Sequence, residues 1–156
     1  MDKEIEEILD KANGLLNKTM IQTLIKSIEG EKITSIQTGV GSIIYFGNEE
    51  FFFTIYCSWR LRNNNCVLVN WHQTEMELIE INLNKLSNLR VISVIVNEMF
   101  DLSIKFENGL ILDVFTDIAD NNYGHSIVDN WDFVIVSDNL CYSINYMLNV
   151  KTENYL

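Results

Sequence analysis

Asp101, Ser103 and Asp113 are the residues whose types and spacing come closest to a catalytic arrangement. All three fall on the polar side of a β-hairpin that we expect around an Asn-Gly turn at 108–109. Two carboxylates can divide acid and base roles when burial separates their pKa values. On an exposed sheet face both carboxylates stay ionised. The spacing therefore predicts a polar surface cluster rather than a catalytic pair.

Metal binding is poorly supported by the remaining polar residues. His72 and His125 are the only histidines, and neither has a second ligand at helical or strand spacing. The stretch Asp120-x-Asn122-x-Gly124 resembles the start of a calcium loop, but the bidentate Glu is absent. We expect a solvated loop there and no bound metal.

The three cysteines, at positions 57, 66 and 141, show no C-x-x-C spacing, so we expect reduced thiols. The sequence also lacks a G-x-S-x-G motif, a phosphate loop and a dinucleotide fingerprint. We therefore expect no cofactor and no enzymatic activity.

Two groups of residues are candidates for a binding interface. Arg and Trp are enriched at interface hot spots, and four such residues cluster in the sequence between 59 and 71. An Asp-rich stretch at 117–132 supplies the acidic candidates. The complete set is Trp59, Arg60, Arg62, Trp71, Asp117, Asp120 and Asp129. The alternative without a binding role is a core Trp in each β block, solvated Arg residues and a solvated acidic loop.

Charge and hydropathy exclude several classes of protein. The 156 residues carry 22 acidic and 11 basic side chains, for a formal net charge of −11. This balance argues against a nucleic-acid binder, which needs clustered Lys and Arg. The apolar content of 47% excludes a disordered chain, and no apolar run is long enough to span a membrane. The first residues do not read as a secretory signal, so we expect a cytoplasmic protein.

The chain reads as a single α+β domain over 1–156. Residues 1–29 are expected to form two helices, the first capped by Asp2 and ended by Asn13-Gly14. Another segment, 74–88, has helical spacing, although a strand also fits part of it. Segments 30–73 and 89–149 show strand periodicity and form two β blocks.

Two hairpins carry specific register predictions. Around Gly47 a four-residue loop would pair Phe46 with Phe51. At the Asn-Gly turn two registers compete, and a three-residue loop with Gly109 in a left-handed bulge keeps one face wholly apolar. We expect that second register, which pairs Ile104 with Leu112.

The two β blocks look like copies of one unit. Segment 33–36 matches 91–94, and segment 43–48 matches 103–108; each block ends in a Trp-bearing segment. This similarity predicts an antiparallel β-meander repeated twice, with a helix between the repeats. Because each meander is too small to be stable alone, we expect the two to share one core.

A family resemblance rests on Phe106-Glu107-Asn108-Gly109-Leu110, on Asn130-Trp131 and on Cys57-Ser58-Trp59-Arg60-Leu61. With these motifs the chain is similar to small uncharacterised bacterial proteins with a duplicated β-meander, some of which resemble immunity proteins of toxin systems. The likeness covers residues 30–137. It implies a fold more than a function, and no catalytic residues come with it.

Three functions are open at this point. The leading one is a non-enzymatic interaction protein, most specifically an immunity protein whose acidity steers a basic toxin partner. The alternative is a small-ligand-binding or enzymatic domain with a pocket between the β blocks, using Tyr45, Tyr56, Trp59 and Asp113. The third is a homo-oligomer that pairs unpaired edge strands.

Overall fold

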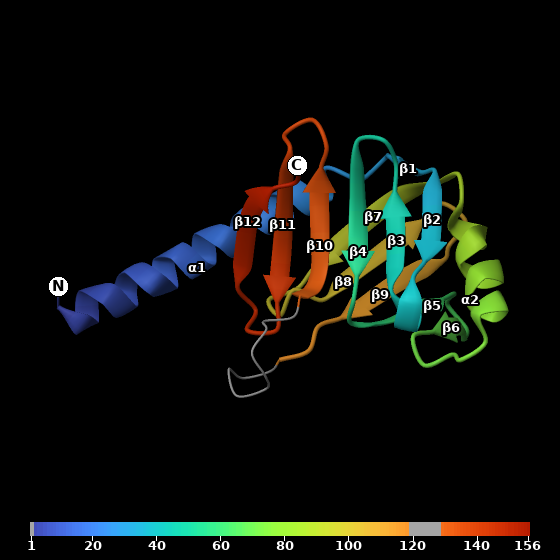
Figure 1. Cartoon of the computed structure of the whole chain (residues 1–156), viewed down its shortest axis with the longest axis horizontal. Coiled ribbons are helices and arrows are strands. Elements are labelled where there is room, and N and C mark those ends of the chain that lie inside the picture. Colours follow the sequence, from blue (N-terminus) through green and yellow to red (C-terminus); the bar gives the residue numbers. More distant parts are fainter. Residues whose placement is uncertain (1, 119–128) are drawn as a thin grey trace.

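Among the described residues, alternating apolar side chains along twelve strands form two antiparallel sheets of six strands each. The computed structural model describes residues 2–118 and 129–156, and in it the two sheets pack face to face (Figure 1). The apolar faces of both sheets enclose one core, and the polar faces point outward. The predicted α+β class with antiparallel sheets is confirmed.

The first sheet has the order β1-β7-β8-β9-β5-β6 and the second the order β12-β11-β10-β4-β3-β2. The strands of the first sheet are β1 (Lys32–Ile33), β5 (Ser58–Arg62), β6 (Val67–Asn70), β7 (Leu89–Val96), β8 (Leu102–Phe106) and β9 (Ile111–Phe115). Those of the second are β2 (Ser35–Thr38), β3 (Ile44–Gly47), β4 (Phe51–Ile55), β10 (Asp129–Ile135), β11 (Leu140–Asn145) and β12 (Val150–Asn154).

Each sheet combines strands from both halves of the chain, which differs from the expected pair of separate meanders. The meander β2-β3-β4 is extended by β10 to β12 from the second half, and the meander β7-β8-β9 is extended by β5 and β6 from the first half. The chain therefore changes sheets three times: between β1 and β2, and at two longer-range crossovers after β4 and after β9. This exchange pairs an edge of each meander with a strand from the other half.

Buried Asn130 forms hydrogen bonds with the chain at both the crossover after β4 and the crossover after β9. Its backbone oxygen accepts hydrogen bonds from the amides of Tyr56 (2.9 Å) and Cys57 (3.1 Å), where the first crossover begins. Its side chain accepts from the amide of Asp117 at 2.8 Å and donates to the carbonyls of Asp117 and Asn145, both at 3.0 Å. One fully buried residue thus satisfies the backbone of three separate segments.

Two fully buried tryptophans occupy equivalent places in the strands that follow the crossovers. The indole of Trp59 donates to the carbonyl of Ser42 at 2.8 Å, and that of Trp131 donates to the carbonyl of Phe100 at 2.9 Å. Both acceptor residues have a positive φ and lie two residues before the central strand of a meander. Each indole therefore satisfies its only polar group inside the core.

The Asn-Gly hairpin adopts the predicted register. Ile104 pairs with Leu112, Gly109 has a φ of +85°, and the amide of Phe106 donates to the carbonyl of Leu110 at 2.9 Å. Glycine suits this left-handed position because it has no Cβ.

The hairpin at Gly47 has a different register from the predicted one. Phe46 pairs with Phe53, not with Phe51, and the two rings stack with centroids 4.9 Å apart. The carboxamide oxygen of Asn48 accepts from the amides of Glu50 and Phe51, which fixes a tight Asx turn just after Gly47.

A single helix, α1 (Lys3–Lys26), replaces the two helices expected at the N-terminus. Asp2 caps it as predicted, because its carboxylate accepts from the amide of Glu4 at 3.3 Å. Gly14 does not adopt the left-handed conformation needed to end a helix. A glycine inside a helix costs only about 1 kcal/mol relative to Ala, and the leucines that follow sustain the helix.

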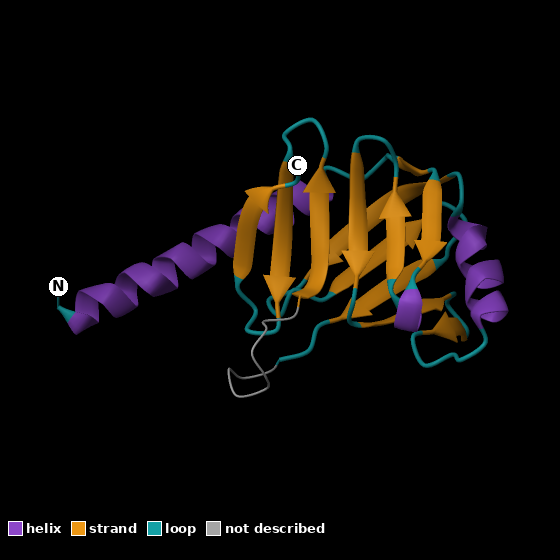
Figure 2. Cartoon of the chain, viewed as in Figure 1, coloured by secondary structure: helices purple, strands orange, loops and turns teal. Residues whose placement is uncertain are grey.

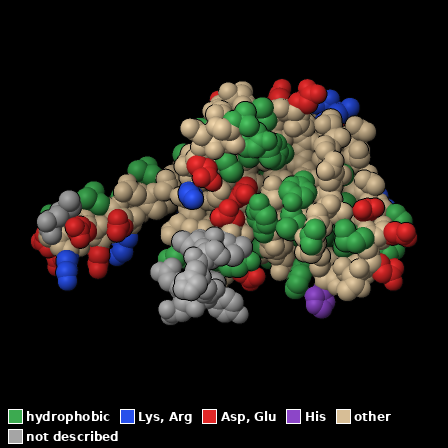
Figure 3. Space-filling view, in the orientation of Figure 1, with side chains coloured by type: hydrophobic (Ala, Val, Ile, Leu, Met, Phe, Trp, Pro, Cys, Tyr) green, Lys and Arg blue, Asp and Glu red, His purple; other side chains and the backbone are tan. Residues whose placement is uncertain are grey.

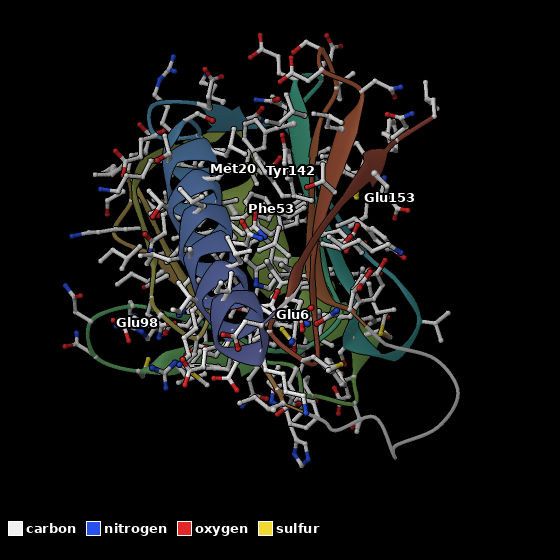
Figure 4. The ribbon with its side chains drawn as sticks, turned by 90° about the vertical axis from the view of Figure 1, so that its left-hand side faces the viewer. Glu6, Met20, Phe53, Glu98, Tyr142 and Glu153 are labelled. Atoms are coloured by element: carbon white, nitrogen blue, oxygen red, sulfur yellow. The ribbon has the colours of Figure 1, made fainter. Side chains whose placement is uncertain are left out.

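The helices cover the two open sides of the sandwich (Figure 2). The C-terminal half of α1 lies across the gap between the sheets (Figure 4). Ile21 and Ile25 of the helix are buried there, and so is Ile28 just after it. At the opposite side lies α2 (Met76–Leu83), followed by the 3-10 turn Asn84–Leu86. A further 3-10 turn spans Val40–Ser42. Within the described ranges, no helix combines the length and apolarity that a membrane span requires.

We predict that Asn130→Ala lowers the free energy of unfolding by about 3 kcal/mol, because it leaves the amide and carbonyl of Asp117 and the carbonyl of Asn145 without their partner in a fully buried position. Chemical denaturation followed by tryptophan fluorescence measures the change. The matched control is Asn64→Ala, at an exposed turn position with no side-chain hydrogen bond, which should change it by less than about 0.5 kcal/mol. Equal effects of the two substitutions would contradict the proposed role of Asn130.

Candidate functional site

The outer face of the first sheet carries one buried carboxylate between two arginines. Asp113 on β9 lies directly opposite Arg60 on β5. One carboxylate oxygen, Oδ2, accepts from Nε of Arg60 at 2.7 Å and from Nε of Arg62 at 2.6 Å. The other oxygen, Oδ1, accepts from the hydroxyl of Ser103 at 2.9 Å.

These contacts determine the ionisation of Asp113. Burial acts to raise the pKa of its carboxyl, but the hydrogen bonds from Arg62, Arg60 and Ser103 outweigh burial and lower the pKa. Asp113 therefore stays ionised at neutral pH and is not a general acid. It is an anchor that fixes both arginines on the sheet face.

Asp101 does not join this cluster. Its carboxylate instead accepts from the amide of Thr116 at 2.7 Å and from the carboxamide of Asn97 at 3.0 Å, both in neighbouring loops. The expected grouping of Asp101, Ser103 and Asp113 is thus reduced to the last two residues. The arrangement supports a structural role better than paired acid–base chemistry.

The outer face of the second sheet is acidic and aromatic. A cross-strand row places Asp132 of β10 beside Thr54 of β4 and, across β11, in line with Lys151 of β12. The hydroxyl of Tyr56 donates to Asp132 at 3.2 Å, which holds the phenol on this face. Figure 3, which looks onto this sheet, shows acidic side chains gathered over β10 to β12 with exposed apolar side chains beside them.

Asp129 and Asp132 lie close together on this face. Burial, followed by the charge of Asp132 and a hydrogen bond with it, raises the pKa of Asp129 to about 7. Nearby Lys151 opposes this shift and Glu153 adds to it. Burial and Asp132 also raise the pKa of Tyr56 to about 12. The face therefore gains negative charge as the pH rises through neutrality.

The structure places the seven interface candidates in different regions. Trp59 is buried in the core, Arg60 and Arg62 lie on the first sheet, and Trp71 is half-exposed in the loop after β6. Asp117 is exposed after β9, and Asp129 begins β10 on the second sheet. Asp120 lies outside the described residues. The basic candidates and Asp129 therefore lie on different sheets.

The residues of the alternative inter-block pocket do not converge. Tyr45 and Tyr56 lie on the outer side of the second sheet, Asp113 lies on the outer side of the first, and Trp59 lies between the sheets. Aromatic rings fill the space around Phe53: its ring centroid is 4.9 Å from that of Phe46, which stacks on it, and 4.7 Å from that of the tilted Phe133 ring. One open groove, of about 630 Å³, lies elsewhere, between α1 and Phe100.

Histidines and cysteines contribute no metal site in the part of the chain that the structure covers. His72 lies in an exposed loop, where its ring contacts Trp71, and His125 falls outside the described residues. Burial raises the pKa of Cys57 to about 12, so this thiol stays protonated and unreactive. Residues 2–118 and 129–156 contain no group of three His, Cys, Asp or Glu that could hold a metal ion.

Sequence reasoning missed two features of these faces. Arg60 and Arg62 were considered for binding, whereas Asp113 holds them both. The alternation of Arg60-x-Arg62 beside buried Trp59 and Leu61 was a signal that both arginines share the outer face. Asp132 and Glu153 were not singled out, because the strand pairing that brings them together joins remote segments.

Comparison with protein families, curated proteins and solved structures finds no match to this chain. The resemblance to duplicated β-meander proteins stays a prediction. Function must therefore be argued from the faces themselves.

We predict that Asp113→Asn lowers the free energy of unfolding by about 2 kcal/mol at pH 7, because both arginines lose their ionised acceptor. The pKa of Asp113 is lowered on folding, so its contribution is present above about pH 4, the pKa of an unfolded Asp, and is lost as the pH falls further. The difference between wild type and variant should therefore shrink in acid. Urea unfolding at pH 7 and pH 3 measures it, with exposed Asp138→Asn as the control. A difference that is equal at both pH values would refute the ion network.

Asp129→Asn has the opposite pH signature. Because folding raises the pKa of Asp129 to about 7, the wild-type protein loses stability as the pH rises from about 4 through 7. The variant lacks this carboxyl, so its stability relative to wild type should be higher at pH 8 than at pH 5. Urea unfolding at both pH values provides the comparison. A difference in stability between variant and wild type that does not change with pH would contradict the raised pKa of Asp129.

Proposed function

We propose that this chain is a non-enzymatic interaction protein that binds a basic protein through the outer face of its second sheet. Neutralisation of a basic toxin, the activity of an immunity protein, is the function that fits this proposal best. The observation that carries it is the cluster of carboxylates on β10 and β12 (Asp129, Asp132 and Glu153) beside the exposed Tyr45 and Tyr56.

Charge supports a basic partner. Asp129, Asp132 and Glu153 cluster on this face with Lys151 as the nearest cation. The whole chain carries a formal charge of −11, so its field attracts basic proteins from a distance. Long-range attraction raises the association rate and orients the acidic face toward the partner.

The aromatic residues give the same face its short-range contacts. Tyr45 and Tyr56 are 41% and 40% exposed, although each projects from a strand or strand end of a well-packed sheet. Tyrosine is enriched at binding hot spots because it offers a large rigid surface and a hydroxyl. Rigid tyrosines lose little side-chain entropy on binding.

The shape of this face favours a protein over a small ligand. The carboxylates lie on β10 and β12 of the second sheet, and the residues offered for an inter-sheet pocket lie on three different surfaces. When a protein partner covers these carboxylates, they would occlude the basic cleft of that partner. That occlusion is the proposed mechanism of neutralisation.

Acid–base chemistry at Asp129 and Asp132 is the second candidate function. The pKa of Asp129, raised to about 7 by burial and by the neighbouring Asp132, lies in the range that acid–base enzymes use. Substrate turnover that is lost in Asp129→Asn, with binding of a basic protein absent, would favour this enzymatic function over the interaction function.

The test begins with a pull-down from the native host, followed by binding kinetics with the captured protein. We expect a basic partner, and we expect Asp132→Asn/Glu153→Gln to slow association by about tenfold at low salt, with the difference shrinking as salt screens the charges. The matched control is Glu98→Gln, because Figure 4 places Glu98 on the opposite side of the molecule from Glu153. An acidic partner, the absence of a partner, or equal rates for both variants would overturn the proposal.

A further inference from the structure

The N-terminal half of α1 projects beyond the sandwich and carries apolar side chains in solvent. Figure 1 shows this half of the helix extending away from the two sheets. Every residue from Lys3 to Asn17 is exposed, and the first buried residue of the helix is Ile21. The exposed set includes five large aliphatic residues, which are between 48% and 67% exposed: Ile5, Ile8, Leu9, Leu15 and Leu16. We name this segment, residues 3–20, the arm.

The aliphatic residues of the arm form one stripe. With 3.6 residues per turn, Ile5, Ile8, Leu9, Leu15 and Leu16 all fall on the same side of the helix, together with Ala12. Glu6, Glu7 and Asp10 fall on the other side. This is the pattern of a helix that packs against a partner along its length.

The stripe lies on the side of α1 that its own fold does not use. Ile21 and Ile25 pack into the core, and their direction around the helix axis is about half a turn from the centre of the stripe. The helix therefore has two apolar sides. The sandwich covers the one in its C-terminal half, whereas the stripe in its N-terminal half is exposed among the described residues.

We propose that a second copy of this chain covers the stripe, through antiparallel pairing of the two arms. The proposal is independent of the acidic face, because the arm and the second sheet share no residues. Charge along the arm determines the direction of pairing.

Charges are segregated along the arm. Residues 3–10 contain four acidic side chains and one Lys, whereas residues 11–18 contain Lys11 and Lys18 and no acidic side chain. An antiparallel pair places the acidic half of each arm beside the basic half of the other and also opposes the two helix dipoles. A parallel pair would place the two acidic halves side by side.

The geometry of the stripe fits such a pair. Centred near residues 10–11, the pairing brings Ile5 of one arm against Leu15 and Leu16 of the other. Ala12, near the middle of the stripe, lets the two helices approach closely. Five side chains that each expose about 100 Å² would together bury on the order of 1,000 Å² across two copies, which is the lower limit for a specific interface.

A lipid surface is a poorer occupant of this stripe. Helices that lie on membranes carry Lys and Arg on their polar face, whereas the first half of this arm is acidic and would be repelled by anionic lipids.

Sedimentation equilibrium of the full chain, over about 1 to 100 µM, tests the proposal. We expect a monomer–dimer equilibrium, which Leu16→Glu weakens by about tenfold or more because a carboxylate enters the apolar seam. Asn17→Glu adds the same charge one residue further, on the other side of the helix, and should weaken it by less than about twofold. Both positions are exposed in the single chain, so neither variant should alter the thermal unfolding of the sandwich.

Crosslinking tests the direction of the pairing. In a Cys66→Ser background, which removes an exposed native thiol, Lys11→Cys should form covalent dimers with a short bis-maleimide. Glu4→Cys should not, because antiparallel arms hold the two copies of residue 4 at opposite ends. Efficient crosslinking of Glu4→Cys would indicate parallel arms and overturn the proposal. A wild-type chain that stays monomeric at 100 µM would also overturn the proposal. The same holds if the monomer binds phosphatidylcholine vesicles or pairs only with a different protein, because the stripe would then have another occupant.

Discussion

The buried carboxamide of Asn130 is the constraint on which the rest of the structure depends. It holds the loop at Asp117 and the end of β11, while its backbone oxygen holds the start of β5 through Tyr56 and Cys57. The two halves of the chain exchange strands at this point, so neither half can form its sheet without the other. Because a buried unpaired polar group is costly, the junction is favourable only when all its partners are in place.

Because side chains fill the space between the two sheets, we look for the function of the protein on its outer surfaces. Aromatic rings fill the space between the sheets, the first sheet neutralises Asp113 with two arginines, and the second sheet presents ionisable carboxylates beside tyrosines. The arm adds an apolar surface that is separate from both faces. The proposed interaction with other proteins would use these features directly, whereas a reaction inside the sandwich would require space between the sheets.

Local sequence patterns correctly predicted features that depend on neighbouring residues alone. The Asn-Gly register followed from the left-handed preference of Gly109, and the cap at Asp2 followed from unpaired helix amides. Predictions failed where distant partners decide the outcome. The pairing of β4 with β10 joins segments about 80 residues apart, and nothing in either segment alone identifies its partner. Gly14 was assigned as a helix end because its sequence context does not reveal that the helix continues through it.

Amide hydrogen exchange of the full chain tests the central role of the Asn130 junction most directly. The amides of Tyr56, Cys57 and Asp117 all donate to Asn130, so they should exchange only through global unfolding, as slowly as those of β4 and β10. Exchange of these three amides that is orders of magnitude faster than exchange within β4 would show that the junction opens by itself, and would contradict the account.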